Sequence, residues 1–358
     1  LCDNVHSQVD TFYFIHGYSG KGSEIKRREE REYTMLYKDN PQKAKEEILS
    51  ADAVIFGSCP NRFIDMRMRE NKLSFVYSER LFKKSILQML KVKNYKAIKQ
   101  RFLDYKDKNL YVLAASAYLS YDLSHYNFPT EKILKWGYFP EMTETLKTEK
   151  IENSILYAGR FLDWKHAETV IETARILKKD KIDFKVNIVG DGPERDNLKN
   201  LMQKYQLNDC VNFLGLKNHN EVLRLMSLHK IFMFTSDFKE GWGAVLNEAM
   251  ANGCAVVASS AAGSTPYLIK HNQNGLIYKY GNYKNAYKAV KELLTDNEKA
   301  EKLGNNARNT IEKEYGSQVA AERFVVAVKE FCDTGSITPQ ESGVLSSVQV
   351  LKNNWYKQ

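Results

Sequence analysis

The fold is decided most clearly by residues 231–259, which read IFMFTSDFKEGWGAVLNEAMANGCAVVAS. An apolar run opens this stretch, a glycine-flanked loop and a helix-forming segment follow, and a second apolar run closes it. The pattern predicts a strand, a loop, a helix and a strand of an open α/β sheet, in which ligands bind at the carboxyl ends of the strands. Glycines let backbone N–H groups approach an anion, and a helix N-terminus adds a favourable partial charge. The stretch therefore predicts an anion-binding loop.

Two carboxylates in this stretch are candidate ligand-binding groups. Glu240 precedes the tripeptide 241–243, which reads Gly-Trp-Gly, and Glu248 lies eight positions after Glu240 on the expected helix. A loop carboxylate can accept hydrogen bonds from substrate hydroxyls, and one further along the helix can bind a second diol such as a ribose. The bare spacing is also common on solvated helix faces, so the interpretation depends on the surrounding strands and glycines.

Short apolar runs alternate with segments of helical period along the whole chain. This alternation is typical of parallel sheets covered by helices, so an α/β fold is predicted for both halves. The expected strands are 12–15, 53–57, 74–77 and 110–114 in the first half and 155–158, 185–189, 211–214, 231–235, 255–258 and 276–278 in the second.

Helical spacing and breaks in the pattern suggest the domain organisation. Apolar residues recur at helical spacing through 167–177, with Asp163 as the expected N-cap, and again through 198–205 and 317–331. The stretch 136–140, followed by a polar run at 143–150, predicts an interdomain linker. The expected units are an N-terminal domain, 1–140, a C-terminal domain, 141–315, a last helix, 316–332, and a tail of loop composition, 333–358.

Composition narrows the class of protein. The 358 residues are 43% hydrophobic and 12% aromatic, which excludes disordered, collagenous and disulfide-stapled chains. Mean hydropathy is −0.50, and the sequence has no apolar run near the roughly 18 residues that a bilayer requires. The five cysteines lack C-x-x-C spacing, so neither a disulfide framework nor a zinc site is predicted, and a reducing compartment is favoured. Because the chain begins at Leu1, we expect its natural start upstream.

Four ordered motifs carry a resemblance to a known family. The stretch 240–259 resembles the E-x7-E signature region of retaining glycosyltransferases of family 4, which have the GT-B fold. Three further segments follow the order and approximate spacing of that family, namely Ala158-Gly159-Arg160 with Lys165, the run 189–193 (VGDGP) and the run 211–215 (VNFLG). The resemblance covers 151–315 well and the first half only loosely. It implies two Rossmann-like domains facing across a cleft, with the C-terminal helix returning to the N-terminal domain.

The resemblance also implies roles for individual residues. Arg160 and Lys165 match the pair that binds the donor diphosphate, where fixed cations stabilise the leaving group as its negative charge grows. Glu240 matches the glutamate that contacts the donor sugar, and Glu248 matches the one that binds ribose. The remaining donor-site candidates are backbone around the phosphates (Gly159, Gly241, Trp242, Gly243, Ala244, Val245), a cleft wall (Gly190, Asp191) and nucleobase contacts (Gly215, Leu216), although ordinary turns explain the wall and nucleobase positions equally well.

The acceptor side departs from the family pattern. Ser78-Glu79-Arg80 stands where many relatives carry a histidine at the end of a strand. Glu79 is therefore a candidate acceptor-side base or orienting carboxylate, and the alternative is a simple ion pair with Arg80 or a lysine. His16, Ser116 and Asp122 are weaker acceptor-side candidates because each follows an expected strand.

No metal or organic cofactor is predicted. A D-x-D motif after a strand and a His/Asp cluster with ligand spacing are both missing from the sequence. The nucleotide-diphosphate sugar is expected as a donor substrate, and retention of anomeric configuration follows from the family likeness alone.

The segment 80–108 is the strongest candidate for a membrane contact. It contains ten Lys or Arg residues against two acidic ones, interleaved with apolar side chains. A basic amphipathic helix of this kind can bind anionic lipid, but its apolar face can equally pack on the domain core. The net charge of +9 suits an anionic partner such as a nucleotide diphosphate or an acidic lipid surface, and no nucleic-acid partner is predicted.

These observations together predict a metal-independent glycosyltransferase of the hexosyltransferase type. It would move a sugar, with retention, from a nucleotide-diphosphate sugar to a saccharide or lipid-linked acceptor in making a bacterial polysaccharide or glycolipid. A cytoplasmic location is expected, with peripheral contact at the inner face of the membrane. Two alternatives stay open, a nucleotide-sugar epimerase of the same fold and a non-catalytic subunit of a complex.

Overall fold

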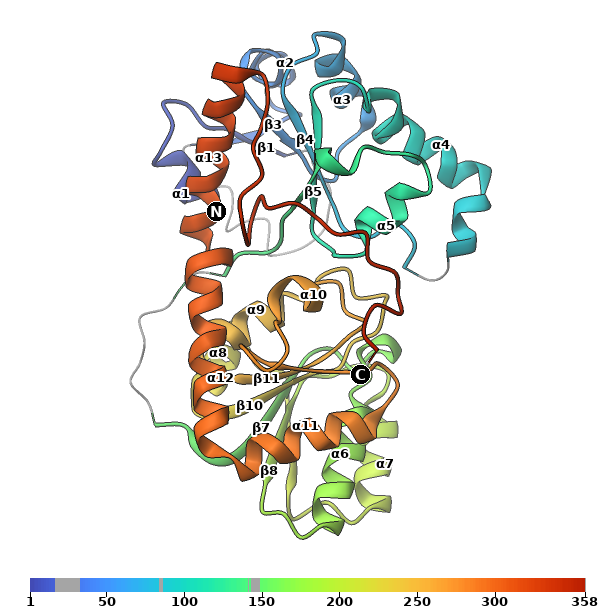
Figure 1. Cartoon of the computed structure of the whole chain (residues 1–358), viewed down its shortest axis with the longest axis vertical. Helices are drawn as coiled ribbons and strands as arrows, with labels where there is room; N and C mark the ends of the chain where they lie inside the picture. The colour runs from blue at the N-terminus through green and yellow to red at the C-terminus, as the bar shows by residue number, and fades with distance from the viewer. Residues whose placement is uncertain (17–32, 84–85, 141, 143–148, 358) are drawn as a thin grey trace.

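The structure, a computed structural model, contains two α/β units stacked along its long axis (Figure 1). It describes residues 1–16, 33–83, 86–140, 142 and 149–357. We call residues 1–140 the N-terminal unit and residues 149–315 the C-terminal unit. All five cysteines lie in the described ranges and are free thiols.

The N-terminal unit is built on a four-stranded parallel sheet of order β3-β4-β5-β6. The predicted strands of this unit are present, but two short ones were not predicted, namely β6 and β2, which pairs with β1 in a separate two-stranded sheet. Length alone does not explain the difference, because β1 and β3 also have three residues and were predicted. The strands are β1 (Phe14–His16), β2 (Thr34–Leu36), β3 (Val54–Phe56), β4 (Ser74–Ser78), β5 (Leu110–Ala114) and β6 (Ile133–Lys135), and the helices are α1 (Cys2–His6), α2 (Pro41–Ser50), α3 (Asn61–Arg69), α4 (Val92–Arg101) and α5 (Leu119–Ser124).

The C-terminal unit is a six-stranded parallel sheet of order β12-β11-β10-β7-β8-β9. All six strands were predicted. The chain leaves β7 to build β8 and β9 on one side, then returns to place β10 on the other side of β7, so a topological switch point lies between β7 and β10. The strands are β7 (Ile151–Ala158), β8 (Lys185–Val189), β9 (Val211–Gly215), β10 (His229–Phe234), β11 (Ala255–Ser259) and β12 (Leu276–Tyr278).

Helices cover both faces of this sheet (Figure 1). The expected cap of α6 is wrong, because Asp163 begins a 3-10 turn, Asp163–Lys165, and His166 then adopts a left-handed conformation that interrupts the helical path. The N-cap of α6 is Ala167. The helices are α6 (Glu168–Lys179), α7 (Arg195–Lys204), α8 (His219–Leu228), α9 (Ala244–Ala251), α10 (Thr265–Leu268), α11 (Tyr283–Thr295), α12 (Asn297–Thr310) and α13 (Ser317–Thr334).

Helix α13 returns to the N-terminal unit, as expected. Its Phe324 ring packs edge-on against Phe75 of β4 with ring centroids 5.1 Å apart, and Val325 packs against Val5 of α1. The tail after α13 has the predicted lack of helices and strands, yet it is well packed. Val344 is fully buried, and the tail runs back from the N-terminal unit to end beside the C-terminal unit (Figure 1).

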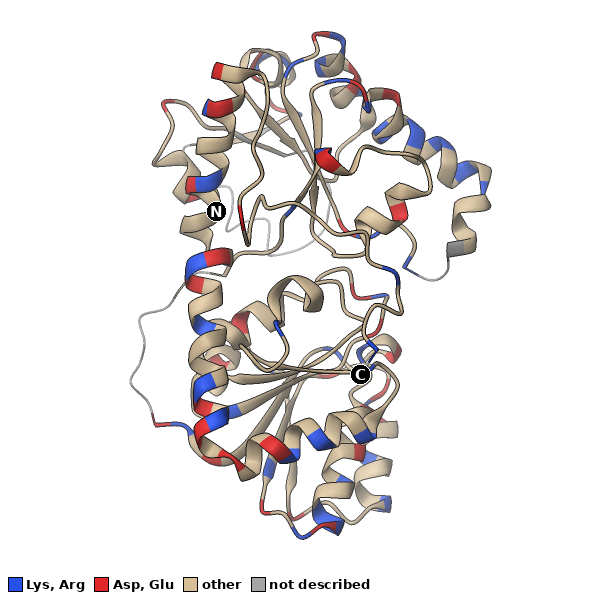
Figure 2. Cartoon of the chain, in the orientation of Figure 1, with Lys and Arg blue, Asp and Glu red and all other residues tan. Residues whose placement is uncertain are grey.

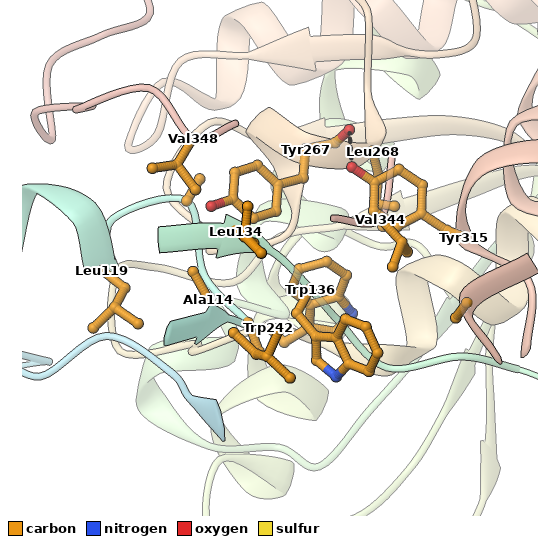
Figure 3. Close-up of a cluster of buried hydrophobic side chains, with 14 of the residues drawn as sticks. Ala114, Leu119, Leu134, Trp136, Trp242, Tyr267, Leu268, Tyr315, Val344 and Val348 are labelled. Atoms are coloured by element: carbon orange, nitrogen blue, oxygen red, sulfur yellow. Dashed lines mark hydrogen bonds between the residues drawn. The ribbon is translucent and has the colours of Figure 1, made fainter. Parts of the chain in front are cut away.

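The two units share a core that includes the expected linker (Figure 3). Trp136 is 3% exposed, and a Cβ atom at Gly137 would overlap the Trp242 ring. The expected linker does run between β6 and β7, and at 136–137 it packs closely against the other unit, which requires a glycine at 137. Residues from three parts of the chain meet in this core, namely the N-terminal unit (Ala114, Leu119, Leu134, Trp136), the C-terminal unit (Trp242, Tyr267, Leu268, Tyr315) and the tail (Val344, Val348).

The basic segment 80–108 is not one continuous amphipathic helix, which corrects the prediction. A 3-10 helix, Ile86–Leu90, is separated from α4 by Lys91, whose backbone is extended, and a second 3-10 turn, Leu103–Tyr105, follows. The alternative of packing on the domain core holds for only part of the segment. Its apolar residues divide between the core (Phe82, Ile98, Phe102) and the surface (Leu87, Leu90, Val92, Tyr95).

Candidate active site

The candidate site lies where the loops after β7 and β10 meet, at the switch point of the C-terminal sheet. Lys165 Nζ forms an ion pair with Glu240 Oε2, and Ser236 Oγ donates to the same carboxylate oxygen at 3.1 Å. The Lys165 and Glu240 side chains are only 16% and 14% exposed. Two of the three expected catalytic residues, 75 positions apart in sequence, are therefore in direct contact.

Backbone contacts join these two loops. Asp237 N donates to Trp164 O at 2.8 Å, and Thr235 Oγ1 donates to Lys165 O at 2.5 Å. Lys239 Nζ also pairs with Asp163 Oδ2 at 2.9 Å. The position of Lys165 relative to Glu240 is thus set by bonds between the loops as well as by their own ion pair.

Arg160, the third expected catalytic residue, is exposed at the start of the loop after β7. Within the ranges that the structure describes, its guanidinium has no hydrogen-bond or ion-pair partner. An unpaired guanidinium presents a planar set of donors that suits phosphate oxygens. Its preceding residue, Gly159, donates its N–H to Val189 O at 3.0 Å and so ties the loop to β8.

The turn before α9 has the geometry that an anion site needs. Gly243 has φ 90° and is the N-cap of α9, a left-handed conformation that glycine adopts without strain. Ala244 and Val245 lie in the first turn, where backbone N–H groups have no acceptor within the helix. The side chain of Trp242 points into the shared core and donates from Nε1 to Asn247 Oδ1 at 2.7 Å, so only its backbone can line the site.

Glu248 lies one turn further along α9. Its side chain is 20% exposed, and burial raises the pKa of its carboxyl above the ordinary value, opposed by His219, whose Nδ1 lies 3.8 Å away. Leu216, which follows β9, is 73% exposed.

The glycines of the expected cleft wall have a packing reason. A Cβ atom at Gly190 would overlap the carbonyl oxygen of Gly159, so the loops after β7 and β8 approach more closely than any other residue would allow. Asp191 accepts from Gly192 N at 2.8 Å and pairs with Arg195 at 3.0 Å. These contacts agree with the alternative interpretation of this segment as a structural turn.

Of the expected acceptor-side candidates, Glu79 is the one that the structure places against the loop before α9. A Cβ atom at Gly241 would overlap the Glu79 carboxylate, so the end of β4 touches the donor loop directly. Glu79 Oε2 pairs with Lys83 Nζ at 2.5 Å, and Tyr138 Oη lies 3.3 Å from Oε1. Arg80 instead pairs with Asp122, so the alternative of a lysine partner for Glu79 is the one observed.

The other acceptor-side candidates lie elsewhere. Ser116 is fully buried at the contact with Gly263, so its hydroxyl does not face a cleft. Asp122 is fully buried and accepts from the N–H groups of 81 and 82, which gives it a structural role. His16 ends β1, and the residues directly after it lie outside the described ranges.

His166 lies beside the site and was not predicted from the sequence. Both of its ring nitrogens face partners, Glu168 on one side and Asp237 with Tyr280 on the other. Its position directly after Lys165 was the available signal. Among residues with described placement, no group of three or more His, Cys, Asp or Glu side chains gathers as a metal site.

Comparisons with known proteins agree with this geometry. Residues 139–310 match the family model for glycosyl transferases group 1. The N-acetyl-alpha-D-glucosaminyl L-malate synthase of Bacillus anthracis is 28% identical over 204 residues, covering 56% of this chain and 51% of that protein. The amylovoran biosynthesis glycosyltransferase AmsK of Erwinia amylovora is 33% identical over 162 residues, covering 43% and 40%. The chain spans about half the length of the curated relatives that it matches.

Solved structures show the same architecture. HepE of Anabaena, in complex with UDP, superposes with a TM-score of 0.67 at 15% identity and covers 87% of this chain and 90% of its own. A glycosyltransferase of Rickettsia africae gives a TM-score of 0.65 at 18% identity, covering 89% and 90%. The expected fold class, GT-B with two Rossmann-like units, is confirmed, and residues 139–310 of this chain are matched by the glycosyl transferases group 1 family.

Proposed function

We propose that the protein is a glycosyltransferase that uses a nucleotide-diphosphate sugar as donor. The observation that carries this proposal is the convergence of a partly buried Lys165–Glu240 pair, an unpaired Arg160 and the N-terminus of α9 at one switch point. Two cations and a helix N-terminus suit a diphosphate, and a carboxylate beside them suits the hydroxyls of the attached sugar. The UDP named with HepE supports a nucleotide donor.

The same geometry suggests how the chemistry proceeds. As the glycosidic bond breaks, negative charge grows on the leaving diphosphate. Arg160 and Lys165 stabilise this charge more strongly in the transition state than in the ground state. Glu240 orients the sugar by accepting from its hydroxyls. Glu79, in contact with Gly241, is placed to orient the incoming acceptor hydroxyl. We propose a retaining, metal-independent reaction in which these protein cations do the work of a divalent metal.

A nucleotide-binding experiment tests the donor assignment. We expect one of UDP, GDP, CDP and ADP to raise the melting temperature, since a ligand at about 100 times its Kd adds roughly 2.7 kcal/mol. Arg160→Ala should abolish the shift. The matched control is Arg175→Ala on α6, whose guanidinium pairs with Glu172 away from the site and whose loss should leave the shift intact. If none of the four nucleotides shifts the wild-type protein, the donor assignment is wrong.

We further propose that the acceptor is a saccharide or lipid-linked saccharide and that the protein contacts an anionic membrane. Leu87, Leu90 and Val92 are 66%, 72% and 68% exposed, unusually high for large apolar side chains that lie close together. Exposed lysines alternate with them at 91, 93 and 96, and Figure 2 shows basic residues along α4. Apolar side chains can enter the lipid interface while the ammonium groups meet headgroups. No helix in the described ranges is long and apolar enough to cross a bilayer.

Charge removal tests the membrane contact. Changing Lys91, Lys93 and Lys96 together to alanine should reduce co-sedimentation with anionic vesicles, because about 1 kcal/mol of attraction is lost per lysine. The wild-type association should weaken as salt rises. The matched control removes three exposed lysines from the C-terminal unit, at 284, 288 and 302, and should change little. Equal sedimentation of both triple variants would leave the segment as an ordinary solvated surface.

A further inference from the structure

His166 occupies an unusual backbone position next to the donor site. It follows Lys165 directly and has φ 49° and ψ 44°, in the left-handed region. A residue other than glycine is strained there and persists only when its surroundings hold it. His166 is one of eight non-glycine residues with positive φ in the described ranges, so the backbone alone assigns it no role and only its side-chain contacts indicate one.

The imidazole is held from both sides. Nδ1 lies 2.6 Å from Glu168 Oε1, and Nε2 lies 3.1 Å from Tyr280 Oη and 3.5 Å from Asp237 Oδ2. Nδ1 faces a carboxylate, and Nε2 faces a hydroxyl and a second carboxylate, so both nitrogens have groups that can accept from an imidazolium. The hydrogen bonds to Asp237 and Glu168 raise the pKa of His166 to about 9. His166 is therefore a cation at neutral pH.

This cation joins the loop that carries Lys165 to the loop that carries Glu240. On the first loop it is adjacent to Lys165, and on the second it contacts Asp237, three residues before Glu240. Its Tyr280 contact adds a third element, the segment after β12, with ring centroids 5.3 Å apart. The imidazolium thus contacts α6, the loop after β10 and the segment after β12 from the loop that carries Lys165.

We propose that His166 is a positioning residue that holds Lys165 and Glu240 in the arrangement that binds the donor diphosphate. This inference rests on the proposed function, because the diphosphate is its ligand. His166 does not itself touch the donor. Loss of the imidazolium frees Asp237 to move toward Lys239, which lies 4.0 Å away, and loosens the loop before Glu240.

Two substitutions separate positioning from simple stability. His166→Gly removes the imidazole while relieving the strained backbone, and His166→Asn keeps a neutral polar side chain in a conformation that asparagine tolerates. We expect both variants to melt close to the wild type but to bind the nucleotide diphosphate about tenfold more weakly. In the ligand-free protein, hydrogen exchange should accelerate at 235–241. A purely structural role predicts the opposite, a lower melting temperature with unchanged affinity, and that result would overturn the proposal.

A pH series supplies a second readout. The charged and titratable groups around the ring are Glu168 from α6, Asp237 and Lys239 from the loop after β10, Tyr280 after β12, and Asp163 and Lys165 on its own loop. Wild-type affinity should fall as pH rises through about 9, where the imidazolium loses its proton. His166→Gly should lack this step, and the same step in both proteins would contradict the inference.

The outcomes distinguish this inference from the proposed function. If the wild-type protein binds a nucleotide diphosphate and the His166 variants match it in affinity and exchange, only the positioning role is wrong. If the wild-type protein binds none of the four nucleotides, the donor site is wrong and the positioning role falls with it.

Discussion

Replacing Lys165 with alanine is expected to lower the rate of sugar transfer by about 100- to 1,000-fold, the cost of removing one group that stabilises developing negative charge. The ammonium is 16% exposed, so its field acts in a partly desolvated site. Its removal also leaves Glu240 without its cationic partner. Turnover with saturating donor and the Kd of the nucleotide diphosphate should be measured side by side, and both are expected to worsen.

Two further variants make this result specific. Glu240→Gln should lower turnover while leaving nucleotide binding largely intact, because this carboxylate is assigned to the sugar and not to the diphosphate. Lys178→Ala is the matched control, because Lys178 forms an exposed ion pair with Asp209 on the same unit. This variant should transfer sugar at the wild-type rate. Unchanged turnover in Lys165→Ala would refute the assignment.

The second large effect is on stability, at Trp242. Its side chain is fully buried in the core that both units share, with ring centroids 6.1 Å from Tyr267 and 6.5 Å from Tyr315. Trp242→Ala should reduce the free energy of unfolding by roughly 3–5 kcal/mol, because it leaves a large cavity where the two units pack. Denaturant unfolding followed by circular dichroism measures the change.

Graded substitution checks the physical cause. Trp242→Phe keeps most of the apolar volume but leaves Asn247 Oδ1 without its donor, so a smaller loss of about 1–3 kcal/mol is expected. Trp164→Ala serves as the comparison, because Trp164 is only partly buried and should cost less than Trp242→Ala. Equal losses at 164 and 242 would show that burial between the units does not set the effect.

The central strands of the C-terminal sheet were predictable from sequence because β10 and β11 are buried on both faces and therefore appear as continuous apolar runs. The run 255–259 is buried at every position. In contrast, β6 has three residues and lies at the edge of its sheet, where it meets the tail through the bridge of Leu134 with Ser347. That pairing joins segments more than 200 residues apart, and no local pattern indicates it.

The candidate site divides in the same way between local sequence motifs and contacts that only the structure shows. Glu240 and Glu248 share one local motif, so their relation follows from a strand, a turn and a helix read in order. The contact of Glu79 with Gly241 depends on how the two units pack, and the Lys83 partner of Glu79 became known only from the structure. The burial of Ser116 could not be predicted from the sequence either, because a serine after a strand has the same sequence pattern whether it faces a cleft or another unit.

By itself, the sequence determined the alternation of strands and helices and the position of the glycine-flanked loop before α9, and it named the residues that we propose bind a diphosphate. These features depend on the local spacing of apolar residues, on glycines and on charged residues, all of which can be seen in a short stretch of sequence. Only the tertiary structure decided which charges meet, that Trp136, Trp242 and the tail form one core, and that His166 connects three loops. Such contacts arise from packing between distant segments, where shape and burial select partners that sequence spacing does not specify.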